Sequence, residues 1–130
     1  MEITEEYIAA AANLNACQAA LDWLREKPRT LKELAAYNQD WAVWVIRFAP
    51  DIYAERAWSA LMSLPGGPSE YSLRGIVEWA PDAWRERAWA ALLALPGGPR
   101  EGSLRYIALF APAPFADKAR AEMARRETAK

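Results

Sequence analysis

The sequence predicts an all-α protein, built as a short right-handed solenoid of tandem helix hairpins with an irregular helical part at its N-terminus. Three observations predict this class: a 31-residue internal repeat, apolar residues at helical spacing inside each repeat, and proline and glycine where helices should begin and end. We expect a single domain over residues 1–130. It would hold N-terminal helices in 1–39 and helix-pair repeats in 40–69, 70–100 and 101–130, the last of them a cap.

The 31-residue period is visible in two recurring motifs. Phe-Ala-Pro-Asp at 48–51 returns as Trp-Ala-Pro-Asp at 79–82 and in part as Phe-Ala-Pro at 110–112, and Leu-Pro-Gly-Gly-Pro at 64–68 returns at 95–99. Residues 48–78 and 79–109 are identical at 19 of 31 positions. A period of this length indicates supersecondary units that bury their apolar faces by stacking on one another.

Local sequence predicts where the two helices of each repeat begin and end. We expect Pro50, Pro81 and Pro112 at the first helical position, because a proline there loses no hydrogen bond. Pro-Gly-Gly-Pro should end that helix as a turn, since glycine accepts a positive φ and proline cannot continue the hydrogen-bond ladder. A shorter helix is expected over about 70–79 and 102–110.

The third repeat departs from the first two in a way that predicts a cap. Trp58 and Trp89 lie on the apolar stripe of the longer helix, and we expect them to pack between repeats. In the third copy their position is Arg120, and a leucine of the first two copies becomes Arg126. The last unit of a solenoid must face water, so residues 112–127 are predicted to be a solvated cap.

The N-terminal third has helix signals but lacks the period. Asn15, Thr30 and Asp40 are expected to be N-caps, and Thr30 with Glu33 fits a capping box. The expected helices run from Thr4 to about Ala12, from Asn15 to about Glu26, from Thr30 to about Tyr37, and from Trp41 to Phe48.

The composition excludes the common catalytic and metal sites. The chain has no histidine and a single cysteine, Cys17, which excludes Cys/His zinc sites, histidine-dependent nucleophiles and an internal disulfide. Cys17 is expected to be a small buried apolar residue. Glu55, Glu86 and Asp117 recur with the repeat, but each is followed by a base, which is typical of a charged outer face. We predict no catalytic residues, no cofactor and no metal.

Charge and hydropathy restrict the partners. The net charge of −1 disfavours direct nucleic-acid binding, which normally needs a basic surplus. No apolar run approaches the roughly 20 residues of a membrane span. The chain begins with acidic residues where a signal peptide needs basic ones, so a cytoplasmic location is expected. The partner is then expected to be a protein or ribonucleoprotein complex, bound by a monomer or small homo-oligomer.

Five residues are predicted to bind that partner. Tyr53, Trp84 and Phe115 are aromatic in all three repeats, which fits either core packing within each unit or an exposed row of interface anchors. Arg56 and Arg87 recur one repeat apart, which fits surface salt bridges, an acidic protein partner or, least of all, a nucleic-acid backbone. A second aromatic group, Trp23, Tyr37, Trp41 and Trp44, is expected to be core or an exposed patch.

Residues 14–44 also resemble a known group of proteins. The pattern consists of Leu14, Ala16-Cys17, Trp23-Leu24, Asp40-Trp41 and Trp44. It is similar to a motif of small helical proteins encoded by bacteriophages and other mobile elements. That resemblance implies a protein that binds a host machine and blocks it, as anti-CRISPR proteins do. The repeats are similar to HEAT repeats, which generally serve binding.

These observations support a non-enzymatic protein-binding module as the leading hypothesis, in the form of a phage-encoded inhibitor of anti-CRISPR type. The alternative is a structural or assembly protein, such as a scaffold or virion component, that self-associates through its repeats. An enzyme acting through carboxylates alone would need two of them to face each other in a deep pocket.

Overall fold

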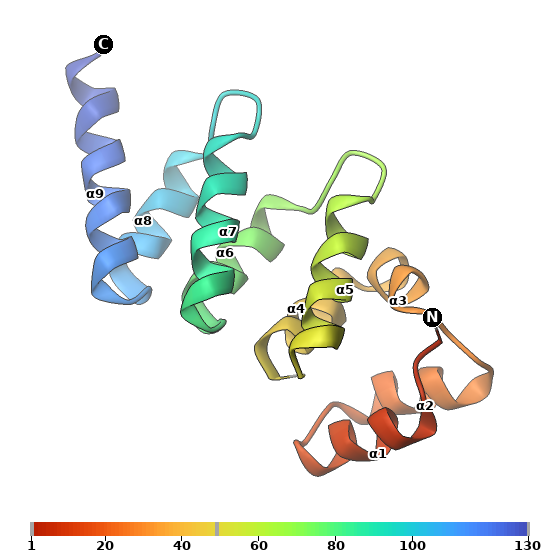
Figure 1. Cartoon of the computed structure of the whole chain (residues 1–130). Coiled ribbons are helices and arrows are strands. Elements are labelled where there is room, and N and C mark those ends of the chain that lie inside the picture. Colours follow the sequence, from red (N-terminus) through yellow and green to blue (C-terminus); the bar gives the residue numbers. More distant parts are fainter. Residues whose placement is uncertain (1, 49, 130) are drawn as a thin grey trace. The chain divides into compact units, whose positions relative to one another are not determined.

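The computed structural model describes residues 2–48 and 50–129, and all the regular elements in these ranges are helices (Figure 1). The all-α class predicted from the sequence is therefore confirmed. The described helices are α1 (Glu5–Asn13), α2 (Gln18–Glu26), α3 (Leu31–Tyr37), α4 (Gln39–Phe48), α5 (Asp51–Met62), α6 (Glu70–Trp79), α7 (Asp82–Leu93), α8 (Glu101–Phe110) and α9 (Ala113–Thr128). None of them is long and apolar enough to cross a lipid bilayer.

The helix bounds repeat with the period of the sequence. Helices α4, α6 and α8 begin and end 31 residues apart, and so do α5 and α7. Each of the first three packs against the helix that follows it, which gives the hairpins α4–α5, α6–α7 and α8–α9. Helix α3 packs on both members of the first hairpin.

The chain divides into two compact units. Unit 1 is Met1–Pro68 and contains α1 to α5, and unit 2 is Ser69–Lys130 and contains α6 to α9. The division falls beside the expected border between the repeats 40–69 and 70–100. Unit 2 is thus made of two complete helix pairs, with α6 and α8 behind α7 and α9 in Figure 1.

Each helix pair contains a completely buried alanine in its longer helix. Ala57, Ala88 and Ala119 occupy the same position in α5, α7 and α9, and each has 0% of its surface exposed. A side chain this small lets two helix backbones approach closely. The surrounding aliphatic residues are also buried, among them Leu61 and its repeat equivalent Leu92 at 0%. The predicted apolar stripe of the longer helix is therefore the core face of each pair.

The two tryptophans of that stripe differ in burial. Trp89 is 8% exposed inside unit 2, whereas Trp58 is half-buried in unit 1. Their equivalent in the third pair, Arg120, is exposed and donates a hydrogen bond of 2.9 Å from its guanidinium to the Ala108 carbonyl oxygen. The guanidinium of Arg120 thus binds the backbone of its own helix pair. In the first two pairs the same position carries the indole ring of a tryptophan.

The loops between helix pairs have the backbone geometry that their glycines predict. Gly66 and Gly67 have φ of 80° and 74°, and Gly97 and Gly98 have 78° and 72°. Such values are strained for residues that carry a Cβ. At Gly98 there is a second reason for glycine, because a Cβ would lie 2.6 Å from the Arg126 guanidinium.

The prolines and two of the expected caps lie elsewhere than predicted. Pro50, Pro81 and Pro112 are N-caps, one residue before the first helical position, with extended ψ of 150°, 153° and 151°. Asn15 is not a cap, because its φ of 64° places it in the left-handed turn after α1. Asp40 is not one either, because its N–H donates to the Asn38 side-chain oxygen at 2.9 Å and α4 begins at Gln39.

The prediction that Cys17 is buried is also wrong. It is the N-cap residue of α2 and is exposed, not a buried core residue. The left-handed turn at Asn15 delays the start of α2, which leaves the thiol outside the helix. The capping box of Thr30 and Glu33 is confirmed, with the Glu33 N–H donating to the Thr30 hydroxyl at 3.1 Å and the Thr30 N–H donating to the Glu33 carboxylate at 3.2 Å.

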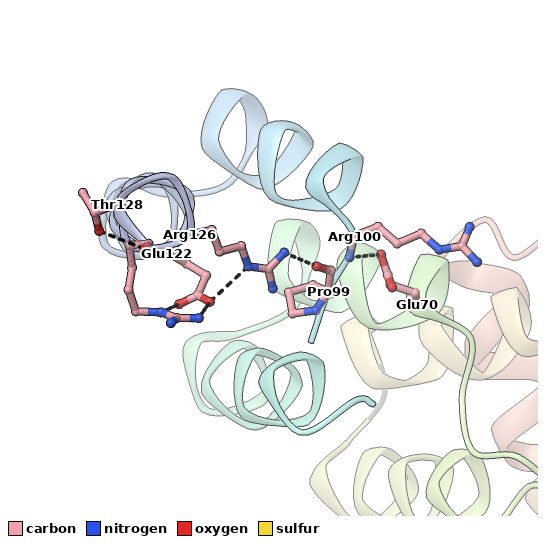
Figure 2. Close-up of polar contacts among 7 residues, drawn as sticks. Glu70, Pro99, Arg100, Glu122, Arg126 and Thr128 are labelled. Carbon is pink, nitrogen blue, oxygen red and sulfur yellow. Dashed lines mark hydrogen bonds and ion pairs between the residues drawn. The ribbon is translucent and has the colours of Figure 1, made fainter. Parts of the chain in front are cut away.

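Helix α8 receives its N-terminal cap from the preceding repeat. Its own N-cap residue, Arg100, makes no side-chain capping bond, whereas the equivalent Ser69 caps α6 through its hydroxyl. The Glu70 carboxylate of α6 supplies the cap that Arg100 lacks. It accepts hydrogen bonds from the Arg100 backbone N–H at 3.0 Å and from the Ser103 hydroxyl (Figure 2). A carboxylate there also meets the positive end of the helix dipole.

Truncation of the core leucine Leu92 to alanine should destabilise the protein strongly. Leu92 is completely buried, and removing a buried leucine side chain costs about 2–5 kcal/mol of unfolding free energy. The neighbouring Leu93 is 44% exposed and provides the matched control, so Leu93→Ala should change stability by less than about 0.5 kcal/mol. Urea unfolding measures both values, and equal losses would contradict the assigned core face.

Removal of the cross-repeat cap should also be costly. We expect Glu70→Ala to reduce the free energy of unfolding by about 1–2 kcal/mol, because two donors at the start of α8 lose their acceptor. The control is Glu101→Ala, at the equivalent position one repeat later, where the carboxylate makes only an exposed pair with Arg105. That change should cost no more than about 0.5 kcal/mol. Chemical denaturation of the two variants tests the contrast, which should disappear if Glu70 does not cap α8.

Candidate functional site

The aromatic row predicted to bind a partner lies mostly inside the protein. Trp84 is 7% exposed and Phe115 is 3% exposed, and Tyr53 is half-buried with its ring stacked on Tyr7 at 4.1 Å between centroids. Trp84 and Phe115 therefore lie where the core interpretation places them, whereas Tyr53 keeps part of its surface accessible. Trp84 and Phe115 have too little accessible surface to act as anchors.

One of the two predicted arginines, and the lysine at the same position of the third repeat, contact rings of that row. The Arg87 guanidinium lies 4.5 Å from the centroid of Trp84, and the Lys118 ammonium lies 5.0 Å from that of Phe115. Lys118 also pairs with Glu86 of the preceding repeat at 3.3 Å. Arg56 is half-buried and lines a shallow hollow of unit 1. Arg87 and Lys118 therefore lie over rings of the core, and Arg87 itself is exposed.

A different row of aromatic residues is exposed. Phe48, Trp79 and Phe110 are the last residues of α4, α6 and α8, and 42%, 56% and 60% of their surfaces are accessible. They occupy one position of the 31-residue repeat, directly before each Ala-Pro. In the sequence these residues mark the repeat, and they are not among the five predicted to bind a partner.

In unit 2 the exposed row is part of a larger surface, which we call the aromatic face. It lies on α6 and α8: Tyr71 is three residues before Arg74 and eight before Trp79, and Tyr106 is three and four residues before Leu109 and Phe110. Trp79, Tyr71, Leu109 and Phe110 are 56%, 63%, 74% and 60% exposed. The aromatic face consists of Tyr71, Arg74, Trp79, Tyr106, Leu109 and Phe110.

Contacts within the aromatic face hold its side chains in place. The Arg74 guanidinium lies 4.2 Å from the ring centroid of Tyr106 and 5.0 Å from that of Tyr71, so it joins the two helices. Tyr106 also contacts Phe110, with centroids 4.9 Å apart. The buried Glu78 carboxylate accepts a hydrogen bond from Tyr106 and raises the pKa of that phenol. The surface is therefore pre-ordered, which reduces the entropy lost on binding.

Unit 1 has a related aromatic group. Trp44 and Phe48 on α4 are 5.1 Å apart and repeat the pair Tyr106–Phe110 of α8 at the same positions. Trp23 stacks on Tyr37 at 4.7 Å, and Trp41 lies 5.8 Å from Trp23. The sequence did not distinguish between a buried core and an exposed patch for this cluster. In the structure some of its rings are half-buried and one is exposed.

Trp23 and Trp41 are half-buried in this cluster, whereas Tyr37 is 63% exposed. The Arg29 guanidinium lies 4.0 Å from the Trp23 ring. The cluster therefore joins α2, α3 and α4 and presents one ring to solvent.

The charged residues at the end of α9 form a structural network. The Glu122 carboxylate accepts from Arg125 at 2.6 Å and from Arg126 at 3.2 Å, and Arg126 donates to the Pro99 carbonyl oxygen at 2.6 Å (Figure 2). The hydrogen bond from Arg125, together with Arg126, lowers the pKa of Glu122 to about 2. This network fastens the last helix to the loop before α8.

No metal site was found in the part of the chain that the structure describes, since no three or more cysteine, aspartate or glutamate side chains there are grouped to hold an ion. Comparisons of the chain with protein-family models, with curated proteins and with solved structures found no match. The functional assignment therefore rests on the aromatic face and its chemistry.

The pKa of Glu122 predicts an acid-sensitive contribution to stability. Because the folded-state pKa is below the usual value of 4.5, this contribution is complete above about pH 4.5 and is lost as the pH falls toward 2. Wild type should therefore be more stable than Glu122→Gln at pH 6, and the difference should shrink below pH 4.5. Thermal unfolding of both proteins across this range measures it, and a constant difference would contradict the assigned network.

Proposed function

We propose that this protein is a non-enzymatic protein-binding module that docks on a protein or ribonucleoprotein complex through the aromatic face of unit 2. One observation carries the proposal. Four large apolar side chains of α6 and α8 are each more than half exposed: Tyr71, Trp79, Leu109 and Phe110. Large exposed apolar surfaces mark interaction sites on soluble proteins.

The chemistry of the face supports a protein partner. Tyrosine, tryptophan and arginine dominate the energetic centres of protein interfaces, because they combine large contact area with polar or charged groups. Arg74 lies between Tyr71 and Tyr106, so its charge is already partly balanced by the two rings. A partner that offers an apolar pocket with a polar rim fits this arrangement.

The specific form of the proposal is a phage-encoded inhibitor of anti-CRISPR type that occupies a surface of a host complex. It is supported by the resemblance of residues 14–44 to small helical proteins of mobile elements. It is also supported by the small helical-repeat scaffold, which presents its binding side chains on rigid helices. Such an inhibitor acts by covering a surface that the host complex needs, which requires no chemistry of its own.

Replacing two residues of the aromatic face should abolish partner capture. We expect the double variant Trp79→Ala/Phe110→Ala to retain at most a tenth of the partner that the immobilised wild type recovers from a bacterial host lysate, since the loss of two anchors exceeds 1.4 kcal/mol. The matched control is Met62→Ala/Leu93→Ala, a pair 31 residues apart with 44% exposure each, at the ends of α5 and α7. This control should capture the partner as well as wild type.

Two further measurements separate the inhibitor from the alternatives. In a host whose CRISPR system blocks a phage, expression of the wild-type chain should restore plaque formation, and the aromatic-face variant should not. Light scattering should give a monomer or small oligomer. Stable large assemblies, or unchanged capture by the Trp79→Ala/Phe110→Ala variant, would contradict the proposal and favour a self-associating structural protein.

A further inference from the structure

Unit 1 contains an apolar pocket that the proposed function does not use. Its volume is about 240 Å³, and it is lined by side chains of α1, α2, α3 and α4 together with the residues before α1 and α2. Aromatic rings of Tyr7, Trp41 and Trp44 contribute to its walls, and aliphatic residues and alanines form most of the rest. The exposed Cys17 and Asp40 are the lining residues that mark its opening.

The walls of this pocket are held in place by contacts outside it. Tyr7 is stacked on Tyr53 at 4.1 Å, and Trp41 contacts both Trp23 at 5.8 Å and Tyr37 at 5.5 Å. The segment before α1 is fixed as well, because the Ile3 N–H donates to a backbone carbonyl of the α2–α3 loop at 2.7 Å. Because these ring contacts restrict rotation of Tyr7 and Trp41 into the pocket, the pocket is a preformed space.

Its size and lining define the class of ligand. An apolar cavity of about 150 Å³ is enough to hold benzene, and drug-sized ligands use pockets of about 300–1,000 Å³. The present volume of about 240 Å³ lies between these values, which suits one or two fused rings. An ionised ligand would lose its hydration without finding a buried partner, and the Asp40 carboxylate at the opening repels anions in particular.

One polar group in the walls remains unsatisfied. The Tyr7 hydroxyl is buried and has no hydrogen-bond partner among the described residues. Burial, and to a lesser extent Tyr53, raises the pKa of this phenol to about 12, so it stays a neutral donor at physiological pH. A buried donor without an acceptor is unusual in a native protein.

We propose that this pocket binds a small, uncharged aromatic molecule of one or two rings. Indole is a suitable probe, because it is bicyclic, neutral and carries a single polar group. The single cysteine of the chain provides a built-in reporter, since Cys17 lies in the pocket wall and its exposed thiol reacts with iodoacetamide. A ring that occupies the pocket should cover this thiol.

The experiment measures the rate of Cys17 alkylation in the full chain at increasing indole concentration. We expect a saturable decrease of at least five-fold. Indole-3-acetate has the same ring with a carboxylate, and at equal concentration it should give less than a two-fold decrease. Absence of protection by indole up to its solubility limit, or equal protection by the charged analogue, would overturn the proposal.

A variant that fills the pocket provides the matched control. Ala20 lies in the pocket wall on α2, and Ala20→Leu should remove the space for the ring, so that indole no longer protects Cys17. Circular dichroism verifies that this variant folds, and Ala16→Leu, also in the wall, replaces it if it does not. Undiminished protection in a folded filled variant would overturn the proposal. So would protection by a tryptophan-containing peptide but not by free indole, which would assign the pocket to a partner's side chain.

Discussion

The complete burial of an alanine at one position of every helix pair is the constraint on which each repeat depends. Ala57, Ala88 and Ala119 are completely enclosed at the same position of three successive helix pairs. A larger side chain at this position would need space that a packed core does not offer, so the face that carries the alanine has to stay buried. On α6 and α8 the buried residues include Ile76 and Ile107, while Tyr71, Leu109 and Phe110 are left exposed.

Much of the fold could be predicted from the sequence, but the exposed aromatic residues could not be identified by periodicity. The rows Tyr53–Trp84–Phe115 and Phe48–Trp79–Phe110 recur with the same period, so repetition alone does not distinguish core from surface. Spacing within a helix does not separate them either. Trp84 lies four and eight residues before the buried Ala88 and Leu92, and Trp79 lies three residues after the buried Ile76. The two differ in their place along the helix, because Trp84 is in the first turn of α7 and Trp79 is the last residue of α6.

The incorrect details concern helix starts, where neighbouring residues compete for the same role. Asn15 and Asp40 have side chains suited to capping, but Asn15 adopts a left-handed turn and Asn38 provides the bond expected of Asp40. Cys17 is therefore the N-cap residue of α2, and it is exposed. The choice among adjacent polar residues depends on how the chain enters the next helix, which tertiary packing decides.

Because Glu70 caps α8, the second helix pair of unit 2 depends on a residue of the first pair. A pair excised at its own boundaries would leave the first turn of α8 without an acceptor, so the natural module for recombination extends across the hairpin border. Glu101 is the repeat equivalent of Glu70 but pairs only with Arg105. An array lengthened by duplicating residues 70–100 would give each additional short helix the acceptor it needs, and only the arginine-bearing final helix would have to stay at the terminus.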